Sequence, residues 1–270
     1  MRIITFFTPG YSRAAQVWRI FAAIHYPSTH ITAYTPNELP QHLRAYCESN
    51  IRGYGFWRWK PFLILNELSQ MSEGEALWYL DVGTLLLNST LPRLEYDYYF
   101  QLSFFHDVRM WCSSSLNLLP SANEFFRHGL MADASVIGIR HSPESVKLVN
   151  EWYDLCCNHL LLGDNIGANA DPPFIDHRHD QSLLSYLIYM NSLRLNMPLT
   201  QFSGKIAPVI LHHRLSNSSN PFAIGKYIAF FLIYKFLYWP FRSSETVVSP
   251  LPTLGASVIQ SILKSLLSTK

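Results

Sequence analysis

Short apolar runs alternate with longer segments of helical periodicity along most of the chain. The apolar runs are rich in β-branched and aromatic residues and end at turn-forming or polar residues, which is typical of strands. They cover residues 3–8, 30–35, 76–80, 96–104, 135–139 and 209–212. The other segments place apolar residues at helical spacing, which predicts helices. They cover residues 14–24, 39–47, 61–71, 142–159 and 182–191.

This alternation sets the fold class and points to one edge of the fold. Strands that alternate with helices indicate an α/β fold, with a mixed, mainly parallel sheet flanked by helices. In such sheets ligands bind beyond the carboxyl ends of the strands. The step Asp81-Val82-Gly83 directly follows the apolar run 76–80. We therefore expect Asp81 to lie at the binding edge of the sheet.

Composition narrows the class of protein. The chain has 270 residues, of which 49% are hydrophobic, enough for one sizeable core or for a core with a short appendage. Aromatic residues make up 14% of the chain and charged residues 15%, a balance that excludes a disordered chain. The net charge is only +2 and no dense run of Lys and Arg occurs, so nucleic acid is not an expected partner.

The four cysteines and the N-terminal residues 1–9 indicate the cellular compartment of the protein. The four cysteines, at 47, 112, 156 and 157, form no C-x-x-C pair, which argues against a zinc or thioredoxin-type site. We expect them to be reduced thiols in the cytoplasm. Residues 1–9 lack the long apolar core of a signal peptide and are expected to enter the first strand directly.

The composition changes after residue 216, which divides the chain into a first domain, 1–216, and a C-terminal segment, 217–270. Residues 222–241 are almost wholly apolar and aromatic, interrupted by Lys226 and Lys235. Two lysines suit a helix lying in a membrane surface better than one that crosses it. We expect a helical appendage attached peripherally to the cytoplasmic face of a membrane. The alternative is a helix docked on the first domain.

Two of the polar sets that could carry chemistry lie in the first third of the chain. A carboxylate at a strand end, such as Asp81, can bind a divalent cation that carries a diphosphate; the alternative is a turn residue. Residues 52–61 read RGYGFWRWKP, with cations just ahead of a helix and aromatic side chains between them. The cations suit a phosphate and the aromatic rings suit a nucleobase or a sugar. The alternative is a surface loop anchored by aromatic packing.

Two further sets follow later in the chain. Residues 176–181 read DHRHDQ, and helix capping explains one carboxylate but not the whole cluster. His177 and His179 with Asp180 could instead bind a metal, which would make the protein a metal-dependent hydrolase. After the last strand, residues 212–214 read HHR, in which His can ligate a metal and Arg can neutralise a phosphate. A purely structural role at the strand end is the alternative.

Taken in order, three stretches resemble glycosyltransferases with the GT-A fold, the nucleotide-diphospho-sugar transferase superfamily, in its distantly glycogenin-like branch. These stretches are RGYGFWRWKP at 52–61, LWYLDVG at 77–83 and FIDHRHDQS at 174–182. Members of the family have sequences such as GYGYWxWKP, YLDAG and HRHDQS at these places. The resemblance covers residues 1–216 and implies a GT-A, Rossmann-like architecture for them.

The resemblance also implies roles for individual residues. Asp180 and Gln181 match the catalytic step that faces the donor sugar and the reacting carbon. Lys60 matches a lysine that reaches the donor diphosphate. The full set of implied donor-binding residues is Tyr54, Arg58, Trp59, Lys60, Asp81, Gly83 and Arg214. The implied metal site, for Mn²⁺ or Mg²⁺, is Asp81 with His212 or His213.

One departure from the family pattern concerns the metal. The D-x-D motif has a second carboxylate where this chain has Gly83. Either phosphates and water complete the coordination of a metal, or Lys60 and Arg214 replace it. The Asp81 step therefore supports donor binding more firmly than it supports a metal ion.

The expected function follows from the same resemblance. We expect the protein to move a sugar, with retention of configuration, from a nucleotide-diphosphate donor such as a UDP-hexose to a glycan or lipid-linked acceptor. Polysaccharide biosynthesis is the expected setting. The alternative is a catalytically inactive module of the same fold that binds a nucleotide-sugar or a carbohydrate.

Overall fold

A computed structural model describes residues 1–86, 91, 92, 94, 96–103, 106–164, 174–196 and 210–212. Its main sheet has six strands in the order β2-β1-β3-β6-β5-β7. These are β1 (Arg2–Phe6), β2 (His30–Tyr34), β3 (Ala76–Leu80), β5 (Tyr98–Leu102), β6 (Ala132–Arg140) and β7 (Leu195–Asn196). A separate two-stranded sheet pairs β4 (Thr84–Leu86) with β8 (Ile210–His212).

Strand directions confirm the prediction of a mixed, mainly parallel sheet. β1 is parallel to β2 and β3, and β5 is parallel to β7. β6 is antiparallel to both β3 and β5, so β5 runs the same way as β3. In the main sheet β6 alone is reversed. The carboxyl ends of β1, β2, β3, β5 and β7 therefore share one edge, where β6 begins.

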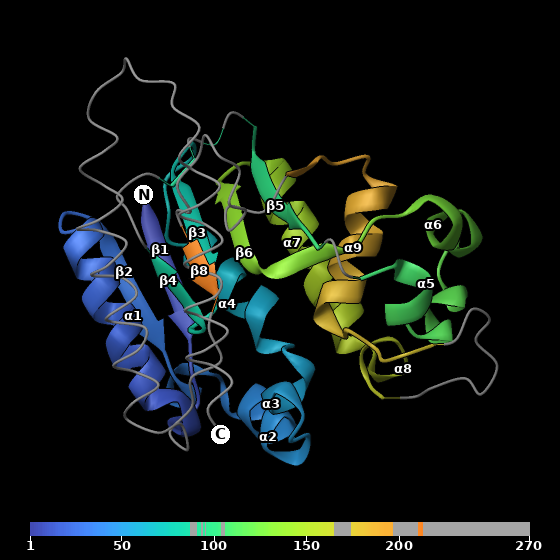
Figure 1. The fold of residues 1–270 in the computed structure, drawn as a ribbon, viewed down its shortest axis with the longest axis horizontal. Helices are drawn as coiled ribbons and strands as arrows, with labels where there is room; N and C mark the ends of the chain where they lie inside the picture. The colour runs from blue at the N-terminus through green and yellow to red at the C-terminus, as the bar shows by residue number, and fades with distance from the viewer. Residues whose placement is uncertain are drawn as a thin grey trace, which may run out of the picture.

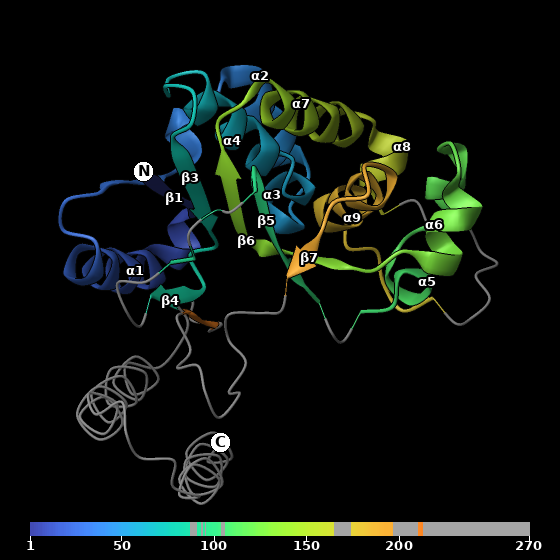
Figure 2. The same ribbon diagram turned by 90° about the horizontal axis from the view of Figure 1, so that it is seen from above.

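Helices cover both faces of this sheet (Figures 1 and 2). The helix α1 (Ser12–His25) lies on one face. On the other face lie α2 (Gln41–Ser49), α4 (Trp59–Leu68) and α7 (Pro143–Cys157). The helix α9 (Asp180–Met190) extends this layer beyond β6 and contacts α7.

The strand residues alternate between two hydrophobic clusters. In β3, Trp78 packs with Trp18 of α1, whereas Tyr79 belongs to the cluster that contains Leu63 of α4 and Trp152 of α7. All five of these side chains are buried. Side chains of successive strand residues point to opposite faces, so a strand covered on both sides reads as a continuous apolar run. This explains why residues 76–80 are apolar throughout.

The strands and helices predicted within residues 1–216 are found, with boundaries shifted by a few residues. The helix expected at 61–71 begins two residues earlier and ends at Leu68. The strand expected at 135–139 is longer and begins at Ala132. Several short elements were not predicted. They are α3 (Gly53–Phe56), α5 (Val108–Trp111), α6 (Ala122–His128), α8 (His159–Leu162), β4, β7 and the 3-10 turns Pro9–Tyr11, Pro36–Glu38 and Ser114–Leu118.

The structure bears on the prediction about the cysteines, but the predicted membrane-attached segment lies outside the described residues. All four cysteines are free, with Cys157 exposed and the other three buried. None of the helices in the described part of the chain is long and apolar enough to cross a membrane. The predicted C-terminal helical segment, 217–270, and with it the run 222–241, lie outside the described residues.

Candidate functional site

Three charged side chains meet at the carboxyl edge of the sheet. Lys60 Nζ lies 3.3 Å from Asp81 Oδ1 and 3.4 Å from Asp180 Oδ2. Lys60 comes from the first turn of α4, Asp81 directly follows β3, and Asp180 is the first residue of α9. The fold thus brings together one residue from each of the three stretches that carry the family resemblance.

Lys60 is buried, and its ammonium group lies near three oxygen atoms and the ring of Tyr79. Its side chain is only 3% exposed, and Nζ also donates a hydrogen bond of 2.9 Å to the carbonyl oxygen of Ala134. An ammonium group has three N–H donors, and here it has three oxygen neighbours. The structure therefore shows Lys60 hydrogen-bonded to Ala134 and ion-paired with both Asp81 and Asp180.

The protonation of this triad follows from burial and from the opposing charges. Burial lowers the pKa of Lys60, but attraction to Asp180 and Asp81 outweighs it, so its pKa lies above the ordinary value. Burial raises the pKa of Asp180 to about 7, against the opposite pull of Lys60 and with a further rise from Asp81. Lys60 is charged, and Asp180 changes its charge near neutral pH.

An irregularity in β6 supplies the backbone groups of the site. Phe100 of β5 pairs with Ile137, but the next residue, Gln101, pairs with Asp133, so the intervening residues of β6 leave the ladder with β5. Among these residues are Ala134, which accepts from Lys60, and Ser135, whose carbonyl oxygen accepts from the backbone N–H of Asp81 (2.8 Å). Bulges of this kind are common beside active sites because they re-aim backbone and side chains.

Lys60 is placed by a left-handed turn that precedes α4. Residues 53–57 all have positive φ, between 50° and 83°. Glycine adopts this conformation freely, whereas the bulky Tyr54, Phe56 and Trp57 adopt it only against steric strain. Packing holds the turn. The ring of Trp57 lies over Gly53, and Gly55 approaches Cys47 of α2 so closely that a Cβ would lie 2.6 Å from its Sγ.

Gly55 and Gly74 have nearly identical φ angles but different surroundings. Substituting each of them therefore distinguishes the cost of backbone strain from the cost of a steric clash with a neighbouring residue. Gly55 has φ +83° and faces Cys47, whereas Gly74 has φ +82° and nothing within 4 Å of a built Cβ. We expect Gly74→Ala to lower the free energy of unfolding by about 1–2 kcal/mol, the cost of a left-handed non-glycine residue. Gly55→Ala should cost about 1–3 kcal/mol more, because the methyl group overpacks the contact with α2. Urea unfolding of both variants measures the difference, and equal losses would refute the close-packing role of Gly55.

The other predicted donor-binding residues of this stretch make packing contacts, and the ring of Trp59 lies 5.9 Å from Lys60 Nζ. Arg58 donates to Cys157 Sγ (2.9 Å) and stacks on the ring of Tyr46 at 4.6 Å. Trp59 is buried and stacks on Phe6 with ring centroids 4.0 Å apart. Tyr54 is half-buried and lies 6.0 Å from the same ring. These contacts match the alternative interpretation, in which aromatic packing anchors the segment.

The histidines of the third stretch are held by backbone groups. His177 Nδ1 accepts from the N–H of Ser113 (3.0 Å) and Nε2 donates to the carbonyl oxygen of Leu161 (2.8 Å). Burial lowers the pKa of His177 to about 3, so the ring is neutral. His179 Nδ1 donates to the carbonyl oxygen of Leu162 (2.7 Å). Because His177 has no lone pair left for a metal, the alternative of a hydrolase using His177, His179 and Asp180 is wrong for this arrangement.

The predicted metal site receives limited support from the residues that are described. Asp81 is 34% exposed, and its Oδ1 already accepts from the hydroxyl of Tyr79 (2.5 Å) and faces Lys60. In β8, His212 is in register with Thr84, three residues after Asp81. His213 and Arg214 lie outside the described residues. Within the described ranges, no group of three or more His, Cys, Asp or Glu side chains could hold a metal ion.

A hard dication prefers several oxygen ligands, and it is repelled by a nearby ammonium group. Two carboxylates, Asp81 and Asp180, that are both paired with a buried, charged lysine do not meet that need. The described side chains therefore do not fit Mn²⁺ or Mg²⁺ as a resident ion.

The remaining predicted residues lie close to the triad. Gln181 Nε2 donates to the carbonyl oxygen of Ala132 at 2.6 Å, which fixes the carboxamide against the start of β6. Gly83 is half-buried in the turn that joins β3 to β4, where the N–H of Thr84 bonds to the carbonyl oxygen of Asp81 (2.9 Å). A role for Tyr79 was not predicted from the sequence. Its position two residues before Asp81 in a strand, hence on the same face, is the signal that could have revealed it.

No family model matches the sequence, and no curated protein matches it. Among solved structures, this chain is similar to the galactosyltransferase LgtC in complex with donor and acceptor sugar analogues. The sequence identity is 13%, the match covers 79% of this chain and 87% of that chain, and the TM-score is 0.44. It is also similar to an active-site mutant of LgtC, with 12% identity, 85% of this chain and 94% of that chain covered, and a TM-score of 0.43.

Proposed function

We propose that this protein is a glycosyltransferase that moves a sugar from a nucleoside diphosphate to a hydroxyl group of an acceptor. The observation that carries the proposal is the state of Asp180. Its Oδ2 is buried and has no hydrogen bond among the described residues, only the ion pair with Lys60 at 3.4 Å. Buried polar atoms are normally hydrogen-bonded, so an orphan at the ligand-binding edge of the sheet suggests a missing ligand hydroxyl.

The chemistry of glycosyl transfer matches this carboxylate. As the bond to the diphosphate breaks, positive charge develops on the sugar ring and negative charge on the leaving group. A fixed carboxylate close to the ring stabilises the first of these charges most strongly where water is excluded. Asp180 is buried and its carboxylate is held by Lys60, so little reorganisation is needed when the charge develops. Gln181, fixed against Ala132, is proposed to orient the sugar beside it.

The finer assignments rest on the motifs rather than on the site geometry. The three family-like stretches support a UDP-hexose donor, a glycan or lipid-linked acceptor, and retention of configuration. They also support a role in polysaccharide biosynthesis. A thermal-shift screen against UDP, GDP and ADP, each with and without Mn²⁺, tests the donor and the need for a metal. Stabilisation by UDP but not by GDP or ADP would support the donor assignment, whereas no response to any nucleotide would contradict it.

A second candidate is an inactive carbohydrate- or nucleotide-sugar-binding module. Lys60 is buried and its charge is already paired with two carboxylates in this structure, which favours that candidate over one that needs the lysine for a diphosphate. Turnover separates the two. A transferase releases nucleoside diphosphate from a nucleotide-sugar, whereas a binding module is stabilised by the sugar without releasing anything.

The pKa of Asp180 predicts how transfer depends on pH. Its pKa of about 7 means that the carboxylate is mostly protonated below that value. Because the charged form stabilises the reacting sugar, we expect kcat to rise about tenfold between about pH 6 and about pH 8. The same shift lowers stability as pH rises from 3.8 to about 7, since the folded state holds the proton more tightly than the unfolded state. A kcat that stays constant across this range would contradict the assignment.

We further propose that the protein acts in the cytoplasm, with the segment 217–270 attached to the membrane surface. The support is the apolar, lysine-interrupted run 222–241. Deleting residues 222–270 should move the protein from the membrane fraction to the soluble fraction of lysed cells. Unchanged recovery of the truncated protein in the membrane fraction would contradict this part of the proposal.

A further inference from the structure

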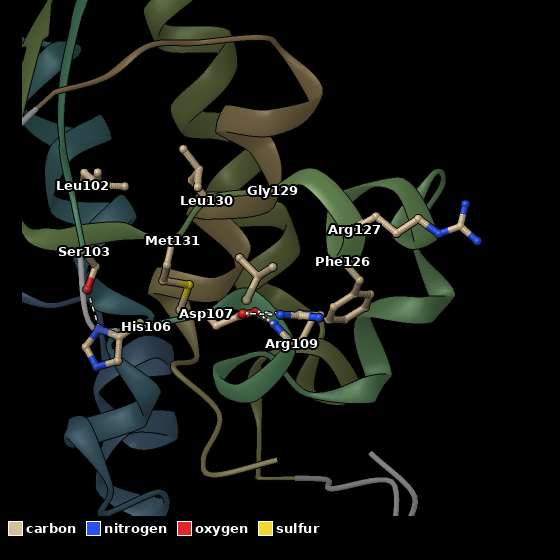
Figure 3. Close-up of a pocket in the computed structure, with 11 residues that line it drawn as sticks. Leu102, Ser103, His106, Asp107, Arg109, Phe126, Arg127, Gly129, Leu130 and Met131 are labelled. Atoms are coloured by element: carbon tan, nitrogen blue, oxygen red, sulfur yellow. Dashed lines mark hydrogen bonds and ion pairs between the residues drawn. The ribbon is translucent and has the colours of Figure 1, made fainter. Parts of the chain in front are cut away.

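A pocket of about 410 Å³ opens next to the end of β5 (Figure 3). Its volume lies within the range of small-molecule sites, roughly 300–1,000 Å³. The walls come from the end of β5, the start of α5, the end of α6 and the residues that lead into β6. The residues on which its chemistry depends are His106, Asp107, Arg109, Phe126, Leu130 and Met131.

The pocket adjoins the candidate site. β5 runs parallel to β3, so its end lies at the same edge of the sheet as Asp81. Met131 in the pocket wall immediately precedes Ala132, whose carbonyl oxygen accepts from Gln181. On another side, His106 Nε2 is 2.9 Å from Arg178 NH2, two residues before Asp180. Two hydrogen bonds therefore connect the pocket wall, or the residue next to it, to Gln181 and to the segment that precedes Asp180.

The polar wall of the pocket is a planar pair of opposite charges. Arg109 donates from Nε and from NH2 to the two carboxylate oxygens of Asp107, at 3.1 and 2.7 Å (Figure 3). Asp107 also caps α5 through the N–H of Arg109. The guanidinium has five N–H donors, and two of its side-chain N–H groups hold the carboxylate. The pair thus presents both donors and acceptors in one plane, which suits vicinal hydroxyl groups.

The lining also contains apolar groups and contributes little net charge. Phe126, Leu130 and Met131 offer an aromatic ring, an aliphatic side chain and a thioether. Asp107 neutralises Arg109, and the remaining guanidinium in the lining, that of Arg127, lies 3.4 Å from Glu124. A ligand with one apolar face and several hydroxyl groups fits this lining, whereas a diphosphate would find little uncompensated positive charge.

We propose that this pocket binds a neutral hexose residue of the acceptor and delivers its hydroxyl group toward Asp180 and Gln181. The acceptor role rests on the proposed glycosyltransferase function. The sugar ring lies with its C–H face against Phe126 and Leu130, and its hydroxyl groups bond to Asp107 and Arg109. The pocket is thereby separate from the donor site at Lys60 and Asp81.

The methyl group of Met131 reports on occupation of the pocket directly. The full-length protein is labelled with [methyl-¹³C]methionine and titrated with the methyl β-glycosides of glucose, galactose and N-acetylglucosamine. We expect at least one glycoside to shift the Met131 signal, assigned through Met131→Leu, and to leave unchanged that of Met71, which does not line the pocket. No shift with any of the three glycosides would overturn the proposal.

Two leucine variants provide a matched control. Leu130 at the pocket is 59% exposed, and Leu118, which does not line it, is 69% exposed. Leu130→Trp should fill the pocket and abolish the shift, whereas Leu118→Trp should preserve it. Asp107→Asn, which can still cap α5, should weaken sugar binding about tenfold. A Met131 shift that persists in Leu130→Trp would contradict sugar binding in this pocket.

Donor hydrolysis without an acceptor separates failure of the pocket from failure of the proposed function. We expect Leu130→Trp to raise the acceptor KM about tenfold, whereas Leu118→Trp should leave both the acceptor KM and the slow hydrolysis of the donor at their wild-type values. Intact hydrolysis with no Met131 response refutes the pocket alone. A Met131 response without turnover of any donor refutes the acceptor role and the glycosyltransferase function, and it leaves a sugar-binding site.

Discussion

Lys60→Met is expected to destabilise the protein by about 3–5 kcal/mol and to abolish transfer. The substitution keeps the length and the apolar stem of the side chain but removes the charge that lies between Asp81 and Asp180. Removing one partner of a buried ion pair leaves the other charge uncompensated, which costs about 3–5 kcal/mol. Asp180 is the more affected of the two carboxylates, because its side chain is 4% exposed whereas that of Asp81 is 34% exposed.

Urea unfolding with a matched lysine variant measures this effect. Lys147 lies exposed on α7, so Lys147→Met should change stability by less than about 0.5 kcal/mol. Adding Asp180→Asn to Lys60→Met should restore much of the lost stability, because it removes the uncompensated charge. If Lys60→Met is as stable as Lys147→Met, Lys60 does not hold the two carboxylates.

Asp180→Asn is expected to lower kcat by about 100-fold or more, the usual effect of removing one group that stabilises transition-state charge. Asparagine has nearly the same shape, and the bond from Trp152 Nε1 goes to the backbone carbonyl oxygen of Asp180, so the start of α9 should be preserved. Donor binding, measured by calorimetry with UDP, should change little. This combination indicates an interaction made in the transition state.

The control for this variant is Asp97→Asn. Asp97 accepts from the hydroxyl of Ser142 and lies 3.9 Å from Arg140, at the opposite end of the sheet from Asp81. Its substitution should leave kcat within about twofold of the wild type. Equal kcat values for Asp180→Asn and the wild type would remove Asp180 from the mechanism.

The sequence predicted the fold for physical reasons, and the family resemblance singled out three residues that meet in the structure. Strands covered on both faces read as apolar runs, and this marked β3 and placed Asp81 at its end. The order of the three motifs then linked Asp81 to Lys60 and Asp180. In the structure, a carboxylate oxygen of Asp81 and one of Asp180 both lie within 3.4 Å of Lys60 Nζ. Directional rules for parallel sheets explain the position of Asp81, whereas Lys60 and Asp180 lie at the starts of helices and were linked to it by the family resemblance.

What the sequence did not predict depends on tertiary contacts. The left-handed turn at 53–57 needs three bulky residues in an unfavourable conformation, which packing against α2 and Gly53 overrides. The carbonyl oxygen of Ala134 reaches Lys60 only because β6 slips its register with β5. A cation in a motif was taken to face phosphate, but Arg58 turns toward Cys157 and Tyr46.

The most direct test of the central claim is nucleoside diphosphate release from a panel of UDP- and GDP-sugars by the full-length protein. Our account predicts release from at least one donor, accelerated by an acceptor glycan and reduced about 100-fold by Asp180→Asn. Nucleotide binding without release from any donor, or release that Asp180→Asn leaves unchanged, would contradict it.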